Sequence, residues 1–299
     1  MAMKALTVRG LTFGGAPVRI CVPVVARDEA AYETALRRLL PAGHDPAELS
    51  ANGDPAGLSA NGDPAGLRAD YDRAELPADY DLAELRADYW EDLAQASDIA
   101  AREAIIRARL KRARAAVGDR PLLFTFRTAA EGGERAIRPE LYRQINEMAA
   151  ENGVDLCDVE FALSQAEENL RSLPEALRAR GAAVIGSAHD FKATPPAGQL
   201  TERLVRMQES GFDMTKAAVM PRAERDVLEL LDASLRMKEG AADRPYITMS
   251  MGALGAVSRI WGSLSGSAVT FGTAGEASAP GQLPGDLLRT CLKALGEAR

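Results

Sequence analysis

The sequence predicts an α/β protein, a single (β/α)8 TIM barrel, on three observations. Short apolar runs of strand length alternate with helical patterns along the chain, and such alternation implies a parallel sheet. Eight runs are present, which favours a closed barrel over an open doubly wound sheet. The 299 residues, of which 46% are hydrophobic, suffice for one barrel of about 250 residues together with an insertion.

The predicted elements follow one another in a regular order. Residues 4–15, KALTVRGLTFGG, are typical of a short β-hairpin, which would close the bottom of the barrel. The strands are predicted at residues 18–26, 82–88, 121–127, 154–161, 183–190, 214–220, 245–251 and 267–272. The helices are predicted at residues 28–40, 91–117, 138–152, 163–180, 198–211, 222–239, 253–262 and 284–297.

An internal repeat interrupts this order before the second strand. Residues 45–89 consist of five copies of a nonapeptide, from DPAELSANG to DLAELRADY. We expect the last copy to form the strand, because it alone carries both Glu84 and Arg86 and it joins the next helix directly. Residues 44–80 are then an insertion within one domain, 1–299, and a surface loop tolerates such length cheaply. A partner-binding arm or a small repeat stack remains the alternative.

Composition argues against several classes of protein. The net charge of −7 argues against nonspecific nucleic-acid binding, which needs a basic face. No run approaches the roughly 18 apolar residues of a membrane span, and the first residues lack a signal-peptide pattern. We therefore expect a cytoplasmic protein that binds neither membranes nor nucleic acid.

Cofactor and metal signals are weak. The three cysteines, Cys21, Cys157 and Cys291, lie far apart and are expected to be free thiols. The two histidines, His44 and His189, are also distant, so a zinc or iron cluster is not expected. No glycine-rich nucleotide motif follows a strand. We expect no metal and no cofactor.

Polar residues recur near the carboxyl ends of the predicted strands, where barrel enzymes carry their chemistry. They are Glu84, Arg86, Arg127, Glu131, Glu160, His189, Asp190, Lys216, Ser250 and Arg259.

Lys216 is the most informative of these residues. It lies in MTKAAVM, within a strand expected to be buried on both faces. Burial favours the neutral amine, a nucleophile that forms a Schiff base with a carbonyl substrate. Alternatively, the side chain reaches water or pairs with Glu160. His189, one strand earlier, is a candidate for moving protons at neutral pH, or a structural histidine.

Two other features leave alternatives open. Arg259 is either a packed helix residue or the anchor of a carboxylate, to which the guanidinium fork is suited. The small residues of 273–282, TAGEASAPGQ, form either a lid over the barrel mouth or an ordinary loop.

Eight stretches together resemble type I 3-dehydroquinate dehydratase, the Schiff-base enzyme of the shikimate pathway. In the order of that family they are ELRADY (84–89), PLLFTFRTAAEGGE (121–134), DLCDVEF (155–161), SAHDF (187–191), KAAVMP (216–221), ITMSMGALGAVSRI (247–260), GSAVTFG (266–272) and ASAPGQ (277–282). The resemblance covers the chain except for the repeat, and it implies syn elimination of water from 3-dehydroquinate. It also implies a homodimer.

The resemblance implies a role for each matching residue. Lys216 matches the imine-forming lysine, His189 the proton-transferring base, and Glu131 the acid that polarises this histidine and raises its basicity. The residues that match the family's substrate-binding positions are Glu84, Arg86, Arg127, Arg259, Ser278 and Gln282.

Two departures from the family pattern keep alternatives open. Ala188 stands where the family usually has a larger residue, and the repeat is absent from the pattern. A catalytically impaired barrel would instead bind a shikimate-type ligand, or a protein partner through the repeat. A different Schiff-base lyase, such as an aldolase, is a third hypothesis, although Arg259 and the 277–282 segment point to a ring that bears a carboxylate.

Overall fold

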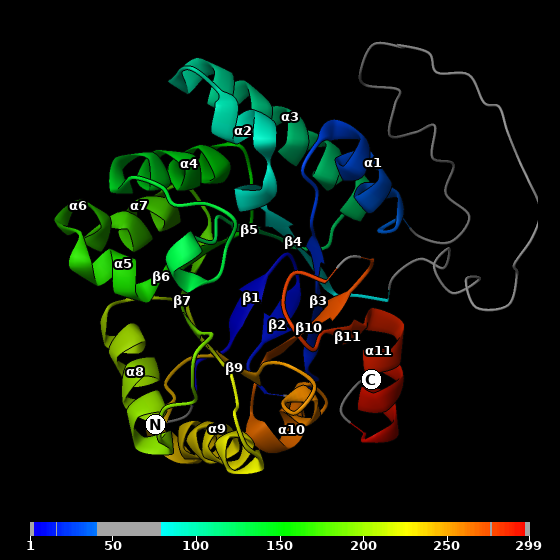
Figure 1. The fold of residues 1–299 in the computed structure, drawn as a ribbon, viewed down its shortest axis with the longest axis vertical. Coiled ribbons are helices and arrows are strands. Elements are labelled where there is room, and N and C mark those ends of the chain that lie inside the picture. Colours follow the sequence, from blue (N-terminus) through cyan, green and yellow to red (C-terminus); the bar gives the residue numbers. More distant parts are fainter. Residues whose placement is uncertain (1–2, 16, 41–78, 276, 297–299) are drawn as a thin grey trace, which may run out of the picture.

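The computed structural model describes residues 3–15, 17–40, 79–275 and 277–296, and these form two sheets, the larger of which is surrounded by helices (Figure 1). His44 and most of the repeat lie outside the described residues. The small sheet is an antiparallel hairpin of β1 (Leu6–Val8) and β2 (Leu11–Phe13). The large sheet is parallel, in the order β11-β10-β3-β4-β5-β6-β7-β8-β9.

The large sheet confirms all eight predicted strands. They are β3 (Arg19–Val24), β4 (Leu82–Arg86), β5 (Leu122–Thr125), β6 (Leu156–Glu160), β7 (Ala183–Asp190), β8 (Met214–Val219), β9 (Tyr246–Ser250) and β10 (Val269–Thr273). A two-residue strand, β11 (Leu283–Pro284), pairs with the end of β10. The last repeat copy supplies β4, as expected from Glu84 and Arg86.

The sheet curls until its two ends approach each other. The Ala268 amide, next to β10, donates to the Tyr246 carbonyl at the start of β9, at 2.8 Å. The helices lie outside the curled strands (Figure 1). They are α1 (Glu29–Arg37), α2 (Glu91–Gln95), α3 (Ile99–Val117), α4 (Pro139–Glu151), α5 (Phe161–Ala166), α6 (Glu168–Arg171), α7 (Leu173–Ala179), α8 (Ala197–Glu209), α9 (Glu224–Arg236), α10 (Gly262–Ser265) and α11 (Gly285–Ala294).

Three of the predicted helices are wrong in detail. The segment 91–117 is broken, because Asp98 caps a new helix by accepting a hydrogen bond from the Ala101 amide at 2.8 Å. The segment 163–180 divides into three short helices, the last beginning around Pro174, which has no amide hydrogen to continue a preceding turn. The segment 253–262 contains a 3₁₀ turn, Ala256–Arg259, followed by the short α10.

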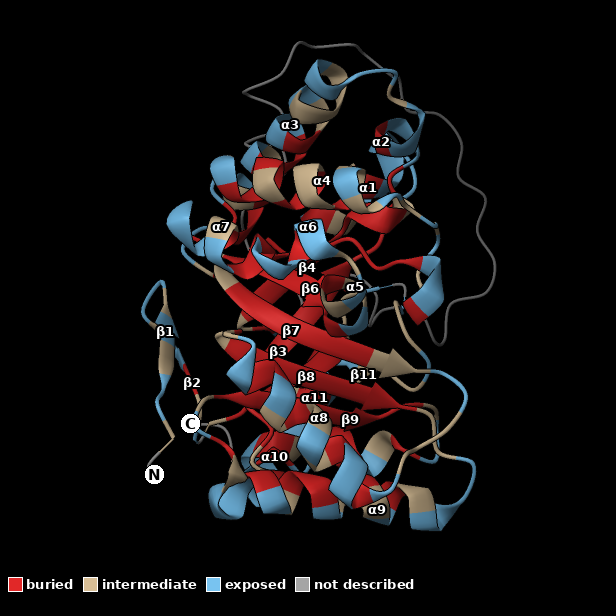
Figure 2. Ribbon diagram, turned by 90° about the vertical axis from the view of Figure 1, so that its left-hand side faces the viewer, coloured by how far each residue is buried: buried red, intermediate tan, exposed pale blue. Residues whose placement is uncertain are grey.

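The hairpin packs against the N-terminal ends of the strands of the large sheet. Figure 2 shows it beside the end at which the strands begin. Buried Phe13 belongs to an apolar cluster with the first residues of several strands, and the Arg19 side chain donates to the Thr12 carbonyl at 3.0 Å. Its turn residues Arg9 and Gly10 have φ of 46° and 76°, the left-handed pair that a tight two-residue hairpin turn requires.

The main apolar core lies between the strands and the helices. Trp90 has its ring centroid 5.9 Å from Tyr32 and 6.0 Å from Phe124, both edge to face. The buried guanidinium of Arg109 lies over Tyr32 and Trp90, at 4.9 and 4.7 Å from their centroids. These contacts join α1 and α3 to the sheet. A second apolar cluster, which includes Leu123 and Leu156, lies with Phe13 of the hairpin.

Candidate active site

Lys216 lies in the middle of β8, paired in register with Ser187 on β7 and Ile247 on β9. Its side chain is buried. The Nζ atom lies 3.4 Å from Asp158 Oδ2 and 4.4 Å from the centroid of the Phe271 ring. Lys216 therefore forms an ion pair, as one alternative predicted, but its partner is Asp158 and not Glu160.

His189 and Glu131 form a dyad two residues beyond that register. Glu131 Oε2 lies 2.9 Å from His189 Nδ1 and also accepts a hydrogen bond from the His189 amide at 3.0 Å. Both side chains are 10% exposed. Because Nδ1 is occupied by the carboxyl group, Nε2 is the ring nitrogen left to exchange protons with a ligand.

The surroundings keep the histidine neutral. Burial, and then the cations Arg127, Lys216 and Arg86, hold the pKa of His189 well below its usual value. Burial likewise raises the pKa of Glu131, against the opposing charge of Arg127. The expectation that Glu131 raises the basicity of His189 stays a prediction, because the lowered pKa is the net result of burial and the neighbouring cations.

A glycine turn places Glu131 opposite His189. The 3₁₀ turn Ala129–Glu131 follows β5 and ends at Gly132, whose φ is 82°. A Cβ at Gly132 would lie 2.2 Å from the Phe191 ring, and one at Gly133 would lie 2.0 Å from the Arg127 carbonyl oxygen. Both glycines are needed for the chain to pass this closely beside the site.

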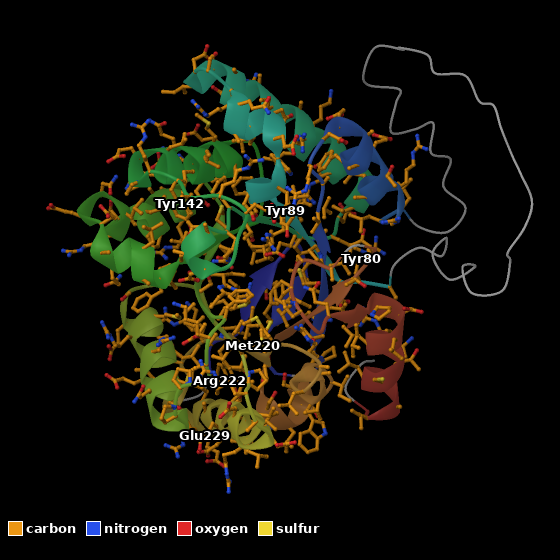
Figure 3. The ribbon with its side chains drawn as sticks, viewed as in Figure 1. Tyr80, Tyr89, Tyr142, Met220, Arg222 and Glu229 are labelled. Carbon is orange, nitrogen blue, oxygen red and sulfur yellow. The ribbon has the colours of Figure 1, made fainter. Side chains whose placement is uncertain are left out.

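Arg127 organises the buried carboxylates between β5, β6 and β7. It donates to Asp158 at 2.7 Å, to Glu160 at 3.1 Å and to the Ser187 hydroxyl at 3.0 Å. Although desolvation acts in the other direction, Asp158, Glu160 and Glu131 raise the pKa of Arg127 well above its usual value. Tyr142 reaches this group from α4 (Figure 3) and accepts a hydrogen bond from the Glu160 amide at 3.1 Å.

Strand β4 contributes a second polar pair. Glu84 accepts a hydrogen bond from the Thr125 hydroxyl at 2.8 Å. Arg86 donates two hydrogen bonds to Asp88, both at 2.8 Å, and its guanidinium lies 4.9 Å from the centroid of the Tyr89 ring, near the centre of Figure 3. Each member of the pair is thus oriented by a buried neighbour.

Arg259 is 1% exposed and lies beneath the 277–282 segment. It donates to the carbonyls of Phe271 at 3.2 Å and Pro280 at 3.1 Å. The structure gives it no carboxylate partner among the residues it describes, and the Arg259 Nε atom is buried without a partner there. Burial lowers the pKa of Arg259 to about 10, so the guanidinium stays charged at neutral pH.

The 277–282 segment folds over the site. The Ser278 amide donates to Gln282 Oε1 at 2.9 Å, and Gln282 Nε2 donates to the Ser278 hydroxyl at 3.1 Å. Arg86 donates to the Ser278 carbonyl at 3.3 Å, and the Gly252 amide donates to the Pro280 carbonyl at 3.1 Å. These contacts fasten the segment to the residues after β4 and β9.

One cavity of about 40 Å³ gathers most of the predicted site residues. This is room for a few water molecules only, so a substituted ring enters only if the segment above it moves. The predicted residues that line it are Glu84, Arg86, Arg127, Glu131, His189, Lys216, Ser278 and Gln282. Arg259 is not a lining residue, but it contacts Met249 and Phe271, which are.

Sequence reasoning missed the residues that support this cavity. Asp158 and Ser187 contact Arg127, and Asp88 holds Arg86. Asp158 could have been found from the alternation of side chains along a strand, because it lies two residues before Glu160 and therefore on the same face of β6. Ala188, noted as a departure, lines a larger groove of about 1210 Å³ that shares Glu131 and His189 with this cavity.

The described part of the chain shows no cluster of three potential metal ligands. Among the helices that the structure describes, none has the length and apolar character of a membrane span.

The fold and site define an α/β enzyme built around a buried amine, a histidine and carboxyl dyad, and several arginines. The family model for type I 3-dehydroquinase matches residues 66–299. The chain belongs to this family.

Individual relatives agree with the family match. The chain is 39% identical over 296 residues to a 3-dehydroquinate dehydratase of Syntrophotalea carbinolica and 38% identical over 293 residues to one of Bacillus licheniformis, covering 98% of both chains in each case. A crystal structure of the type I enzyme from Clostridium difficile, with covalently modified comenic acid, is 32% identical. It superposes with a TM-score of 0.79 over 98% of each chain.

Proposed function

We propose that this protein dehydrates 3-dehydroquinate to 3-dehydroshikimate, a step of the shikimate pathway, through an imine on Lys216. The observation that carries the proposal is the buried Lys216 beside the His189–Glu131 dyad, in a chain of the type I 3-dehydroquinase family. The intact set of polar residues disfavours an impaired barrel that only binds a ligand.

The reaction begins at the ring ketone. The neutral amine of Lys216 adds to the ketone carbon and forms the C–N bond. With uptake of one proton, which the final hydrolysis returns, the ketone oxygen leaves as water and the protonated imine, the iminium, remains. The resulting iminium withdraws electrons from the adjacent carbon. His189 Nε2 removes a proton from that carbon, and the C–H electron pair moves toward nitrogen to give an enamine.

The second half eliminates water. The enamine nitrogen returns its electrons, the C–O bond of the ring hydroxyl breaks, and the hydroxyl leaves as water with the proton held by His189. One group serving both transfers suits loss of proton and hydroxyl from one face. Water then hydrolyses the iminium, which releases the product ketone and restores the amine of Lys216.

The remaining site residues bind and orient the ring. Arg259, without a carboxylate partner in the described structure, suits the substrate carboxylate. Glu84, Arg86 and Arg127 suit the ring hydroxyls, and Ser278 with Gln282 close over the ligand. The narrow cavity beneath this segment is compatible with a lid that opens for entry and excludes water during the reaction.

The proposal extends to the whole chain. We propose one closed (β/α)8 barrel domain over residues 1–299 in which 44–80 is an insertion, supported by the approach of β9 to β10. A homodimer is our expectation from the family resemblance, and a cytoplasmic location stays a prediction from the sequence.

Replacing the nucleophile tests the function. The Lys216→Ala variant should lose turnover of 3-dehydroquinate, measured by the absorbance of the conjugated product, because no other group can form the imine. Far-ultraviolet circular dichroism and thermal unfolding should show that this variant still folds. Full activity in a folded Lys216→Ala protein would overturn the proposal.

A further inference from the structure

Asp158 is the buried carboxylate nearest to the reacting nitrogen, and the mechanism above leaves it without a role. It is fully buried on β6. Its Oδ1 accepts hydrogen bonds from Arg127 at 2.7 Å and from the Ser187 hydroxyl at 2.5 Å. Its Oδ2 lies 3.4 Å from Lys216 Nζ. Asp158 is thus held rigidly by one oxygen and presents the other to the nucleophile.

The other charged groups around Lys216 come from four elements. They are Glu84 and Arg86 on β4, Arg127 and Glu131 in the segment after β5, Glu160 on β6 and His189 on β7. Of the carboxylates, Glu131 binds His189, Glu84 accepts from Thr125, and Glu160 accepts two hydrogen bonds from Thr128, each at 2.7 Å. Asp158 is the carboxylate that forms an ion pair with Lys216 in the described structure.

We propose that Asp158 is the counterion of the Lys216 iminium, a positioning residue that keeps the proton on the imine nitrogen and fixes the plane of the C=N bond. The inference rests on the proposed function and deepens it. The nitrogen of the iminium bears one hydrogen, and Asp158 Oδ2 lies where that hydrogen can be accepted.

The chemistry needs such a group at both imine stages. An unprotonated imine is a poor electron acceptor, whereas the iminium takes the electron pair of the broken C–H bond and becomes a neutral enamine that still carries the N–H. The enamine returns that pair when the C–O bond breaks, and the positive charge is restored. A buried cation is costly unless it is paired. Asp158 is already held beside the nitrogen by Arg127 and Ser187, so it can pair with the iminium without moving.

The Phe271 ring supports the same nitrogen from another side. Its centroid lies 4.4 Å from Nζ, a distance at which an aromatic face attracts a cation. Because an aromatic face accepts no proton, Phe271 favours the charge without competing for it. Asp158 and Phe271 together restrict the directions available to the C=N bond.

The test compares two buried carboxylates on the same strand. The Asp158→Asn variant removes the charge that contacts Lys216. The Glu160→Gln variant removes a charge that also contacts Arg127 but is not paired with Lys216 in the described structure. Each folded variant is mixed with 3-dehydroquinate and borohydride across a range of pH, and the rate of adduct formation on Lys216 is followed by mass spectrometry, with kcat measured in parallel.

We expect the basic limb of the trapping profile to move to lower pH in Asp158→Asn, by about one to three units, because borohydride reduces the protonated imine and an iminium without its counterion loses its proton more readily. We also expect kcat to fall at least tenfold, since the unprotonated imine is a poor electron acceptor. In Glu160→Gln the basic limb should move by less than half as much. Equal profiles in wild type and Asp158→Asn would overturn the inference and leave the proposed function intact, whereas a wild type without adduct would overturn the proposed function itself.

A measurement on the wild type does not depend on a variant that folds. The chain has six lysines, Lys4, Lys111, Lys192, Lys216, Lys238 and Lys293, so a protein labelled with nitrogen-15 at the lysine side chain gives few signals. In the covalent complex, the Lys216 nitrogen should show the shift and the attached hydrogen of a protonated imine up to about pH 9. Loss of that hydrogen below about pH 7 would contradict the role of Asp158.

Discussion

At the scale of single residues, the site is governed by which buried groups hold protons. His189 and Glu131 share one short contact in a place where burial disfavours both charged forms. A neutral imidazole is the form that can accept a proton from the substrate, so burial prepares the base. The same effect places a proton on Glu131, whose pKa rises from its usual value to about 8.

This proton has a consequence for stability. Between about pH 6.5 and 8 the unfolded chain has Glu131 ionised and His189 at most half protonated, whereas the folded dyad holds up to one proton. Folding then binds about half a proton, so the free energy of unfolding should fall as the pH rises, by about 1 kcal/mol over this range. Urea unfolding of the wild type at both ends of the range measures it.

The Glu131→Gln variant is the control, because it has no carboxyl to titrate. Its stability should change less than that of the wild type between pH 6.5 and 8, and the difference isolates the dyad from the rest of the chain. An identical change in the two proteins would show that Glu131 is ionised in the folded site.

At the scale of elements, the turn after β5 determines where the dyad stands. Gly132 has a φ of 82° and faces the Phe191 ring, so a side chain there meets both strain and a clash. Gly153, just after α4, has a similar φ of 85°, but a Cβ there would meet nothing within 4 Å. A substitution at Gly153 would therefore cause backbone strain alone, whereas one at Gly132 would cause backbone strain and also displace residues of the site.

Alanine substitutions exploit this difference. Both Gly132→Ala and Gly153→Ala should lower the free energy of unfolding by about 1–2 kcal/mol, from the left-handed backbone. Only Gly132→Ala should also lower kcat, by about tenfold or more, because Glu131 and Phe191 must shift beside His189. Steady-state kinetics and chemical unfolding of both variants would check this, and equal kcat values would argue against a positioning role for the turn.

Much of the order of the strands, and of the position of the site at their ends, could be predicted from the sequence. Lys216 in an apolar strand and the polar residues that end the other strands gave the site, because parallel strands bring their carboxyl ends to one edge. The prediction of a helix at 253–262 was wrong because Gly255 lies against the Ser250 carbonyl, where a Cβ would meet atoms at 2.4 Å. This contact is a tertiary constraint, which helical periodicity does not reveal. The partner of Lys216 was likewise missed, since the choice between Asp158 and Glu160 depends on distances that spacing does not give.

At the scale of the whole molecule, the repeat interrupts the regular alternation of strands and helices. Its last copy forms β4, with Glu84 and Arg86 facing the cavity. The residues just before β4 are also held: Asp79 pairs with Arg289 at 3.0 Å, and the Tyr80 hydroxyl donates to the Leu39 carbonyl at 2.9 Å. Any deletion within the repeat must therefore keep Asp79 and Tyr80, because both residues make these contacts.

Removal of residues 45–78 should therefore preserve catalysis. This deletion keeps Asp79, Tyr80 and the complete last copy, and we expect kcat and KM to stay within about twofold of the wild-type values because no cavity residue is lost. Kinetics of the shortened protein would check this. A loss of tenfold or more, in a folded protein, would instead favour a functional role for the upstream copies.

The central claim is that Lys216 forms an imine with 3-dehydroquinate. The most direct test is the intact mass of the protein after treatment with 3-dehydroquinate and borohydride, followed by peptide mapping. The account predicts one ligand-sized adduct, located on the peptide that carries Lys216 and absent from Lys216→Ala. A folded wild-type protein that gains no adduct, or gains it at another lysine, would contradict the account.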